Sequence, residues 1–202
     1  YLSDNLLVDS SMIVVVGHGF GGTLAHRIAK ASDGVFSAVI MVGSTALSYE
    51  DYLLRHSNLS SHTADELKAY QDTLDKLSKM KEQTALENTE TVLGHSVYYF
   101  WELQKTNNYE LIRKLRLPTY IVQGKKDPLV PENEGWRQYS NKIGEGVKYV
   151  TYRSFPGLNH VLMSDSSTDA YGLPQYTENA TLDISAGRSI GQWILSLKST
   201  AE

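Results

Sequence analysis

A glycine-rich turn near the amino terminus, Gly17-His18-Gly19-Phe20-Gly21, is the first stretch with the pattern of a reactive site. A short β-branched run, Ile13 to Val16, precedes this turn, and a stretch with helical spacing, Thr23 to Lys30, follows it. Strand, tight turn and helix in this order can present a nucleophilic side chain at the tip of the turn. The residue at the tip is Gly19, which carries no hydroxyl or thiol, so the turn supplies no covalent nucleophile.

Two other interpretations of the turn stay open. Its glycines could serve only the packing of an ordinary strand-to-helix connection, or they could cradle a phosphate, as a G-x-G-x-x-G loop does. A dinucleotide-binding loop of that type needs an acidic residue at the end of the next strand. We expect that strand at Val35 to Val42, and Gly43-Ser44 follows it, so the sequence disfavours nucleotide binding.

The turn resembles the nucleophile elbow of the alpha/beta-hydrolase superfamily, whose usual form is G-H-S-x-G-G followed by a helix. Glycines flank the nucleophile there because the strand bends so sharply into the helix that side chains would collide. The resemblance implies that Gly19 stands where relatives carry a serine nucleophile. It also implies that the Phe20 backbone N–H donates to the oxyanion and that His18 belongs to the substrate-binding residues.

Two later stretches resemble the loops that complete the catalytic triad of this superfamily. Gly124 to Pro131 resembles the G-x-x-D-x-x-V-P acid loop, with Asp127 as the carboxylate. Phe155 to His160 resembles the histidine loop, with His160 as the base. Each loop follows a predicted strand, Leu117 to Gln123 and Val147 to Arg153 respectively. The order nucleophile, acid, histidine along the chain is also the order of this superfamily.

The three loops should converge because the carboxyl ends of parallel strands meet at one edge of a sheet. The resemblance implies hydrolysis of a carboxylic ester through an acyl-enzyme, in which His160 shuttles the proton and Asp127 orients the imidazole. Gly19 removes the covalent step, a loss that typically costs about 10⁶ in turnover. A water held by His160 would remain as a weak nucleophile, so we expect the chain to be inactive as it stands.

Three functions therefore stay open. The first is a serine-type ester hydrolase that lacks its nucleophile, and the retention of both Asp127 and His160 favours it. The second is a non-catalytic pseudo-hydrolase that binds a small ester, a lipid or a peptide. The third is an assembly module that recruits another chain through an exposed sheet edge.

The expected fold class is α/β, the C-terminal part of an alpha/beta-hydrolase fold, with a mostly parallel sheet flanked by helices and a helical lid insertion. Residues 1–46 would hold the elbow strand, its helix and the following strand. Residues 47–116 would form the lid insertion, and residues 117–202 the remaining core with the acid and histidine loops. Within the insertion, Thr63 to Met80 predicts one amphipathic helix that opens with a capping box.

The densest aromatic run of the chain, Tyr98 to Trp101, also lies in the insertion. At helical spacing only part of this run can face inward. One prediction is that Tyr99 and Trp101 bind substrate by lining an acyl or leaving-group pocket. The alternative is a core patch beneath the lid.

The amino terminus is short for this superfamily. Only Tyr1 to Ser11 precede the elbow strand, whereas the full fold has several strands there. We therefore expect a missing N-terminal segment, or a second copy of the chain, to cover a strand edge that would otherwise be unpaired and prone to aggregate.

Composition limits the classes of function. With 202 residues, 41% of them hydrophobic and 21% charged, the chain can bury one sizeable core. Its net charge of −4 disfavours nucleic acid as a partner. Zero cysteines exclude disulfides, a thiol nucleophile and thiolate metal sites, and we expect neither a metal nor a cofactor. No apolar run reaches about 18 residues, so we expect a soluble protein, cytoplasmic or secreted. The chain resembles the lid-bearing serine esterases of bacteria, and this resemblance implies a bacterial source.

Overall fold

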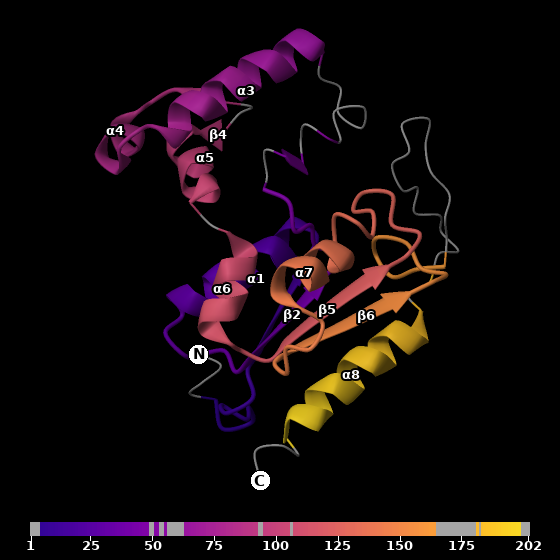
Figure 1. The fold of residues 1–202 in the computed structure, drawn as a ribbon. Helices are drawn as coiled ribbons and strands as arrows, with labels where there is room; N and C mark the ends of the chain where they lie inside the picture. Colours follow the sequence, from indigo (N-terminus) through magenta and orange to yellow (C-terminus); the bar gives the residue numbers. More distant parts are fainter. Residues whose placement is uncertain are drawn as a thin grey trace. The chain divides into compact units, whose positions relative to one another are not determined.

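The structure is a computed structural model that describes residues 5–48, 51–52, 55, 63–92, 95–105, 107–164, 181 and 183–198. The chain divides into two compact units. The first unit contains Tyr1–Ala46 and Asn108–Glu202, and the second contains Leu47–Asn107. Figure 1 shows the helices and strands of both.

A four-stranded sheet forms the centre of the first unit. Its strand order is β1-β2-β5-β6, and every neighbouring pair runs parallel. The strands are β1 (Val14–His18), β2 (Ala38–Val42), β5 (Thr119–Gly124) and β6 (Val150–Phe155). All four predicted strands are therefore confirmed, with boundaries that differ by a few residues.

The two central strands are buried on both faces, as their unbroken apolar runs predict. Successive side chains of a strand point to opposite faces, so β2 contributes to two separate cores. Val39 and Met41 enter the core on one face, and Ile40 and Val42 enter the core on the other. This double burial fixes the two central strands, β2 and β5, between the outer strands β1 and β6.

Helices cover both faces of this sheet (Figure 1). One face is covered by three helices, α1 (Phe20–Ala31), α6 (Asn108–Leu115) and α7 (Trp136–Ile143). The opposite face is covered by α8 (Ile184–Lys198), whose Ala186 is fully buried against the second core. A parallel sheet between helical layers confirms the predicted α/β class.

Helix α1 has the bounds predicted from the sequence, about Phe20 to Ala31, but its buried face differs in part. The apolar spacing predicts Leu24, Ala25 and Ile28 against the sheet; Ala25 is buried, whereas Ile28 is 46% exposed. The other buried positions are Gly22, His26 and Ala29. Small residues are needed because the helix lies very close to β1, so that a Cβ on the strand residue Gly17 would overlap the helix backbone.

Strand β1 lies at one edge of the sheet. It pairs with β2, and among the described residues no strand pairs with its other side. Val16 of this strand is 58% exposed. The predicted cover for this edge, an N-terminal segment or a second copy, stays a prediction.

The second unit is mainly helical. It contains α3 (Ala64–Ser78), α4 (Glu82–Glu87), α5 (Val97–Gln104) and a small antiparallel pair, β3 (Thr91–Val92) and β4 (His95–Ser96). Helix α3 confirms the predicted amphipathic helix, and its capping box joins Thr63 and Glu66. Helix α6, which the predicted insertion 47–116 included, lies in the first unit. A lid role for the second unit stays a prediction.

Candidate active site

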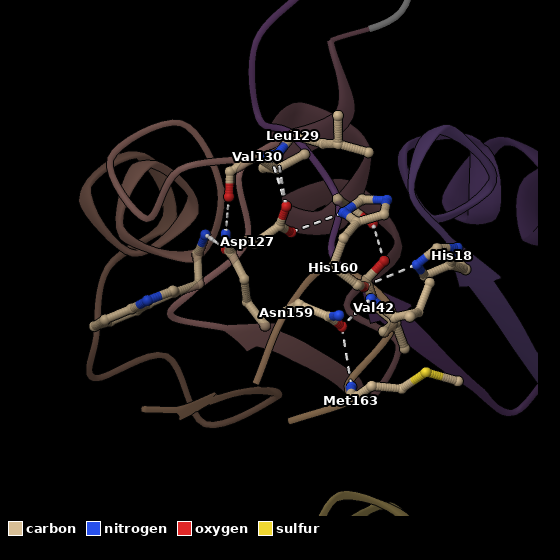
Figure 2. Close-up of polar contacts among 12 residues, drawn as sticks. His18, Val42, Asp127, Leu129, Val130, Asn159, His160 and Met163 are labelled. Atoms are coloured by element: carbon tan, nitrogen blue, oxygen red, sulfur yellow. Dashed lines mark hydrogen bonds and ion pairs between the residues drawn. The ribbon is translucent and has the colours of Figure 1, made fainter. Parts of the chain in front are cut away.

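Three loops that leave the carboxyl ends of β1, β5 and β6 meet at one edge of the parallel sheet. They carry Gly19, Asp127 and His160 respectively. His160 Nδ1 lies 2.8 Å from Asp127 Oδ2, and Figure 2 shows this contact. A Cβ placed on Gly19 would lie 3.3 Å from the other ring nitrogen, Nε2. The structure thus brings together the three residues that the sequence singles out.

The Asp127 carboxylate is held in place by its own loop. Its Oδ1 accepts hydrogen bonds from the backbone N–H groups of Leu129 and Val130, both at 2.9 Å (Figure 2). An aspartate that binds backbone groups two and three residues ahead forms a tight turn by itself. The side chain is 1% exposed, so these two donors and the imidazole replace the water that a buried carboxylate loses. One oxygen is left in a fixed direction toward His160.

Gln123, the next-to-last residue of β5, secures the far end of the acid loop. Its Nε2 donates to the Val130 carbonyl, and its Oε1 accepts from the Trp136 backbone N–H at 2.9 Å. Gly135 makes room for this amide, because a Cβ there would overlap Gln123 Oε1. Sequence reasoning missed Gln123. The available signal was a polar amide inside an otherwise apolar strand.

Asn159 organises the loop that carries His160. Its Oδ1 accepts from the backbone N–H groups of Val161, at 3.1 Å, and Met163, at 3.0 Å (Figure 2). Its own N–H donates to the Met163 carbonyl at 2.8 Å. Leu162 closes the turn with φ 60°, a left-handed conformation that is uncommon for a leucine. The sequence analysis quoted Asn159 only as part of a motif, and its supporting role was missed.

Main-chain hydrogen bonds tie the acid loop to the histidine loop. Lys125 N–H donates to the Phe155 carbonyl and Lys126 N–H donates to the Leu158 carbonyl, both at 2.9 Å. The two loops lie so close that a Cβ on Gly124 would overlap the Leu158 carbonyl. The spacing of Asp127 and His160 is therefore set by the backbone as well as by their own contact.

The hydrogen bond to Asp127 fixes the proton on the His160 ring. A carboxylate accepts, so Nδ1 carries the hydrogen, and in the neutral ring Nε2 is then an acceptor. Within the described parts of the chain, no hydrogen-bond donor contacts Nε2. Because Nε2 faces Gly19, the imidazole is set to take a proton from a group at that position.

Gly19 has an unusual backbone conformation, with φ 55° and ψ −124°. Such angles are costly for residues that carry a side chain, and they recur at functional sites. The Gly19 N–H donates to the Val42 carbonyl at 2.8 Å, and this hydrogen bond ties the turn to β2. Its carbonyl accepts from Gly22 and Thr23 in the first turn of α1. A side chain at position 19 would project toward His160.

His18 lies beside the histidine loop (Figure 2). A carbonyl can only accept, so His18 Nε2 donates to the His160 carbonyl oxygen, at 3.0 Å. The two imidazole centroids are 4.5 Å apart. Substrate binding by His18 stays a prediction. Phe20 is the first residue of α1, directly after the corner, and the oxyanion role of its N–H also stays a prediction.

The other two predicted substrate-binding residues lie in the second unit. Trp101 is 7% exposed, and its Nε1 donates to the Met80 carbonyl at 2.9 Å. The Lys105 ammonium lies 3.2 Å from the centre of the Trp101 ring, in cation–π contact. Tyr99 stacks on His95 with centroids 4.8 Å apart. These contacts are internal to the second unit, so the predicted contact of Tyr99 and Trp101 with substrate is untested.

Two further features bear on function. In the parts of the chain that the structure describes, no three His, Asp or Glu side chains are grouped so as to hold a metal ion. No helix in those same parts is both long enough and apolar enough to cross a membrane.

Comparison with known sequences identifies the family of the chain. The profile of the prolyl oligopeptidase family matches residues 1–175, which include all three site loops. The esterase EstD of Thermotoga maritima is 26% identical over 193 residues, which cover 93% of this chain and 43% of that protein. The chain therefore spans less than half the length of this curated relative.

Comparison with solved structures supports the same fold. The crystal structure of a monoacylglycerol lipase from Paleococcus ferrophilus superposes with a TM-score of 0.50. The sequence identity is 17%, and the match covers 92% of this chain and 68% of that chain. At this identity the likeness concerns the fold alone.

Proposed function

We propose, from the premise that the chain belongs to the prolyl oligopeptidase family of alpha/beta-hydrolases, that it carries a carboxylic-ester hydrolase site in which Gly19 takes the nucleophile's place. The observation that carries this proposal is the orientation of His160. Nδ1 of the ring lies 2.8 Å from Asp127 Oδ2, and Nε2 would lie 3.3 Å from a Cβ at position 19.

The mechanism follows from this geometry. A serine at position 19 would place its hydroxyl against His160 Nε2, which would take the proton as the oxygen attacks the acyl carbon. Asp127 would stabilise the imidazolium and keep the ring in the required tautomer. The Phe20 N–H, at the start of α1, would donate to the oxyanion that develops on the carbonyl. His160 would then return the proton to the leaving alcohol.

The ester class is favoured by the relative that the chain resembles over most of its length. EstD is named an esterase, and its similarity covers 93% of this chain. Gly19 removes the covalent step, which typically costs about 10⁶ in turnover. The unaltered chain is therefore proposed to bind an ester and to hydrolyse it at most very slowly.

The test is to restore the nucleophile and compare it with a matched variant. Gly19→Ser should hydrolyse p-nitrophenyl butyrate well above both the unaltered chain and Gly19→Ala. Alanine has a Cβ like serine and meets the same backbone strain at this position, but it carries no hydroxyl. Adding His160→Ala to Gly19→Ser should abolish the gain. A folded Gly19→Ser variant with no gain would reject the proposal.

A second candidate, the non-catalytic pseudo-hydrolase, is favoured by the glycine itself. At φ 55° and ψ −124° the backbone is least strained when the residue is glycine. Gly19 therefore stabilises the fold, whereas a serine there would supply a nucleophile at a cost in stability. This candidate predicts measurable binding of a small ester, lipid or peptide by the unaltered chain. It also predicts no turnover after Gly19→Ser, which separates the two candidates.

A further inference from the structure

Residues 43–46, which we name the β2 exit segment, lead from β2 to the second unit. Gly43 begins this segment and lies against the His160 ring, since a Cβ on it would stand 3.1 Å from Nδ1. Ala46 ends the segment and is the last residue of the first unit before the chain passes into the second. The chain returns to the first unit at Asn108. Whatever fixes the β2 exit segment thus also fixes the surface against which His160 lies.

The buried hydroxyl of Tyr139, on α7, joins the two places where the chain leaves and re-enters the first unit. It donates to the carbonyl of Thr45, the residue before Ala46, at 2.7 Å, and it accepts from Asn108 Nδ2 at 2.8 Å. Tyr139 is fully buried, and this burial raises the pKa of its hydroxyl well above the ordinary value, so that the group keeps its proton. A buried tyrosine hydroxyl needs hydrogen-bond partners, and both partners here lie at the connections to the second unit.

Two neighbours hold the β2 exit segment from other sides. The Thr23 hydroxyl, on α1, also donates to the Thr45 carbonyl, at 3.2 Å. The Glu134 carbonyl, between the acid loop and α7, accepts from the Thr45 hydroxyl at 3.3 Å and from the Ala46 N–H at 2.8 Å. The hydrogen bond from Tyr139 is the shortest of these, and its donor ring is packed in the core on the α1 face of the sheet. The Tyr139 hydroxyl therefore has a fixed position from which to hold the segment.

We propose that Tyr139 is a positioning residue for His160, because its hydroxyl fixes the β2 exit segment and so holds Gly43 against the imidazole. Tyr139 acts through the main chain, from the Thr45 carbonyl back to Gly43 two residues earlier. The inference rests on the proposed function, since the reaction that His160 supports is the ester hydrolysis of that site.

Tyr139→Phe keeps the ring and removes only the hydroxyl. The Thr45 carbonyl then loses its closest donor, and Asn108 Nδ2 loses its acceptor inside the protein. Buried polar groups are costly to leave unpaired, so the β2 exit segment should shift until these groups find new partners. The His160 ring should move with the segment.

The first readout is the proton NMR signal of the His160 Nδ1–H in the otherwise unaltered chain. Tyr139→Phe should shift or broaden this signal. Tyr152→Phe is the matched control, because Tyr152 packs against the same core and its buried hydroxyl has no hydrogen-bond partner among the described residues. The control makes the same chemical change without touching the β2 exit segment, so it should leave the signal unmoved.

The second readout is the hydrolysis of p-nitrophenyl butyrate in the Gly19→Ser background, at urea-free conditions where every variant is folded. Tyr139→Phe should lower kcat roughly tenfold, since a misplacement of about 1 Å at an active site costs on the order of 10²-fold. KM should stay within about twofold, because the position of the ring affects the chemical step rather than uniform binding. Tyr152→Phe should change neither constant.

A milder variant serves if Tyr139→Phe does not fold. Asn108→Ala removes the donor to the tyrosine and leaves the hydrogen bond to Thr45, so it should cause the same changes at smaller size. The inference is overturned if the signal and kcat are unchanged in folded Tyr139→Phe, or in Asn108→Ala where Tyr139→Phe is unfolded. Equal changes in Tyr152→Phe would overturn it as well.

The two readouts separate this inference from the proposed function. If Gly19→Ser hydrolyses the ester and Tyr139→Phe changes neither kcat nor the ring signal, the inference fails and the proposed function stands. If Gly19→Ser hydrolyses no ester, the proposed function fails. The Nδ1–H signal of His160 then still decides whether Tyr139 positions the ring.

Discussion

Gly43 lies directly against the imidazole of His160, so that a Cβ at this glycine would stand 3.1 Å from both Nδ1 and Cε1 of the ring. The same Cβ would be 3.2 Å from the His160 carbonyl oxygen. Gly43 directly follows β2, has φ 57°, and donates its N–H to the Val122 carbonyl at 2.9 Å. Strand β2 therefore helps to position the histidine although it carries none of the three site residues.

Gly43→Ala should push the His160 ring away from Asp127, because the methyl group is closer to the ring than ordinary van der Waals contact. The proton NMR signal of the Nδ1–H should shift or broaden. Gly34→Ala is the matched control, since Gly34 also has a positive φ but a Cβ there meets nothing within 4 Å. Both variants should lose about 1–2 kcal/mol of unfolding free energy. Only Gly43→Ala should change the ring signal, and an unchanged signal would mean that this contact does not position the ring.

His18 is predicted to position the histidine loop through its hydrogen bond to the His160 carbonyl. His18→Phe keeps a ring beside His160 and removes the donor, so it should broaden the His160 ring signals. His18→Gln supplies an N–H donor without a ring and should restore them. His95→Gln, at an exposed position of the second unit, is the control and should have no effect. Sharp, unmoved His160 signals in His18→Phe would refute the positioning role.

The strained backbone at Gly19 predicts that any residue with a side chain at this position lowers the unfolding free energy. A residue with a side chain at φ 55° and ψ −124° costs on the order of 1–3 kcal/mol, so Gly19→Ser and Gly19→Ala should lower the unfolding free energy by similar amounts. Gly21→Ala should instead raise it by up to about 1 kcal/mol, because Gly21 is helical and a Cβ there meets nothing within 4 Å. Urea titrations measure all three. If neither Gly19 variant loses unfolding free energy, the backbone at Gly19 is not strained.

His26 should make the protein sensitive to acid. The side chain is fully buried, and burial lowers the pKa of His26 to about 4 from 6.5. Its Nε2 lies 3.0 Å from Thr119 Oγ1, and Nδ1 has no hydrogen-bond partner among the described residues. Between pH 6.5 and 4, His26 is therefore protonated in the unfolded chain and neutral in the folded chain. This contribution to stability, about 3 kcal/mol, is present above pH 6.5 and is lost as the pH falls toward 4.

The measurement is the pH dependence of the urea midpoint. The Thr119 hydroxyl donates to the Leu117 carbonyl at 2.8 Å, so His26 Nε2 is the donor to Thr119, and a glutamine amide can replace it. His26→Gln should therefore flatten the fall in midpoint between pH 6.5 and 4. An equally steep fall in this variant would assign the acid sensitivity to other groups.

The sequence predicts the strands, the helices and the meeting of Gly19, Asp127 and His160, because all of these rest on short-range signals. Apolar runs mark the strands, and a loop after a parallel strand must lie at the carboxyl edge of the sheet. The supporting residues depend on contacts between loops that are distant in the chain. Nothing near Gln123 shows that its amide reaches the residues around Val130 and Trp136, and nothing near Gly43 shows that His160 lies against it. The exposure of Ile28 has a similar cause, since the close approach of α1 to β1 selects small residues for the buried face.

The central claim is that Asp127 and His160 form a hydrolase pair directed at position 19. Its most direct test is covalent labelling of Gly19→Ser with a fluorophosphonate, which reacts only with a serine whose hydroxyl is activated by a base. Mass spectrometry should find the adduct on position 19, with none on the unaltered chain and none when Gly19→Ser is combined with His160→Ala. A folded Gly19→Ser variant that stays unlabelled, or that is labelled equally well without His160, would contradict the claim.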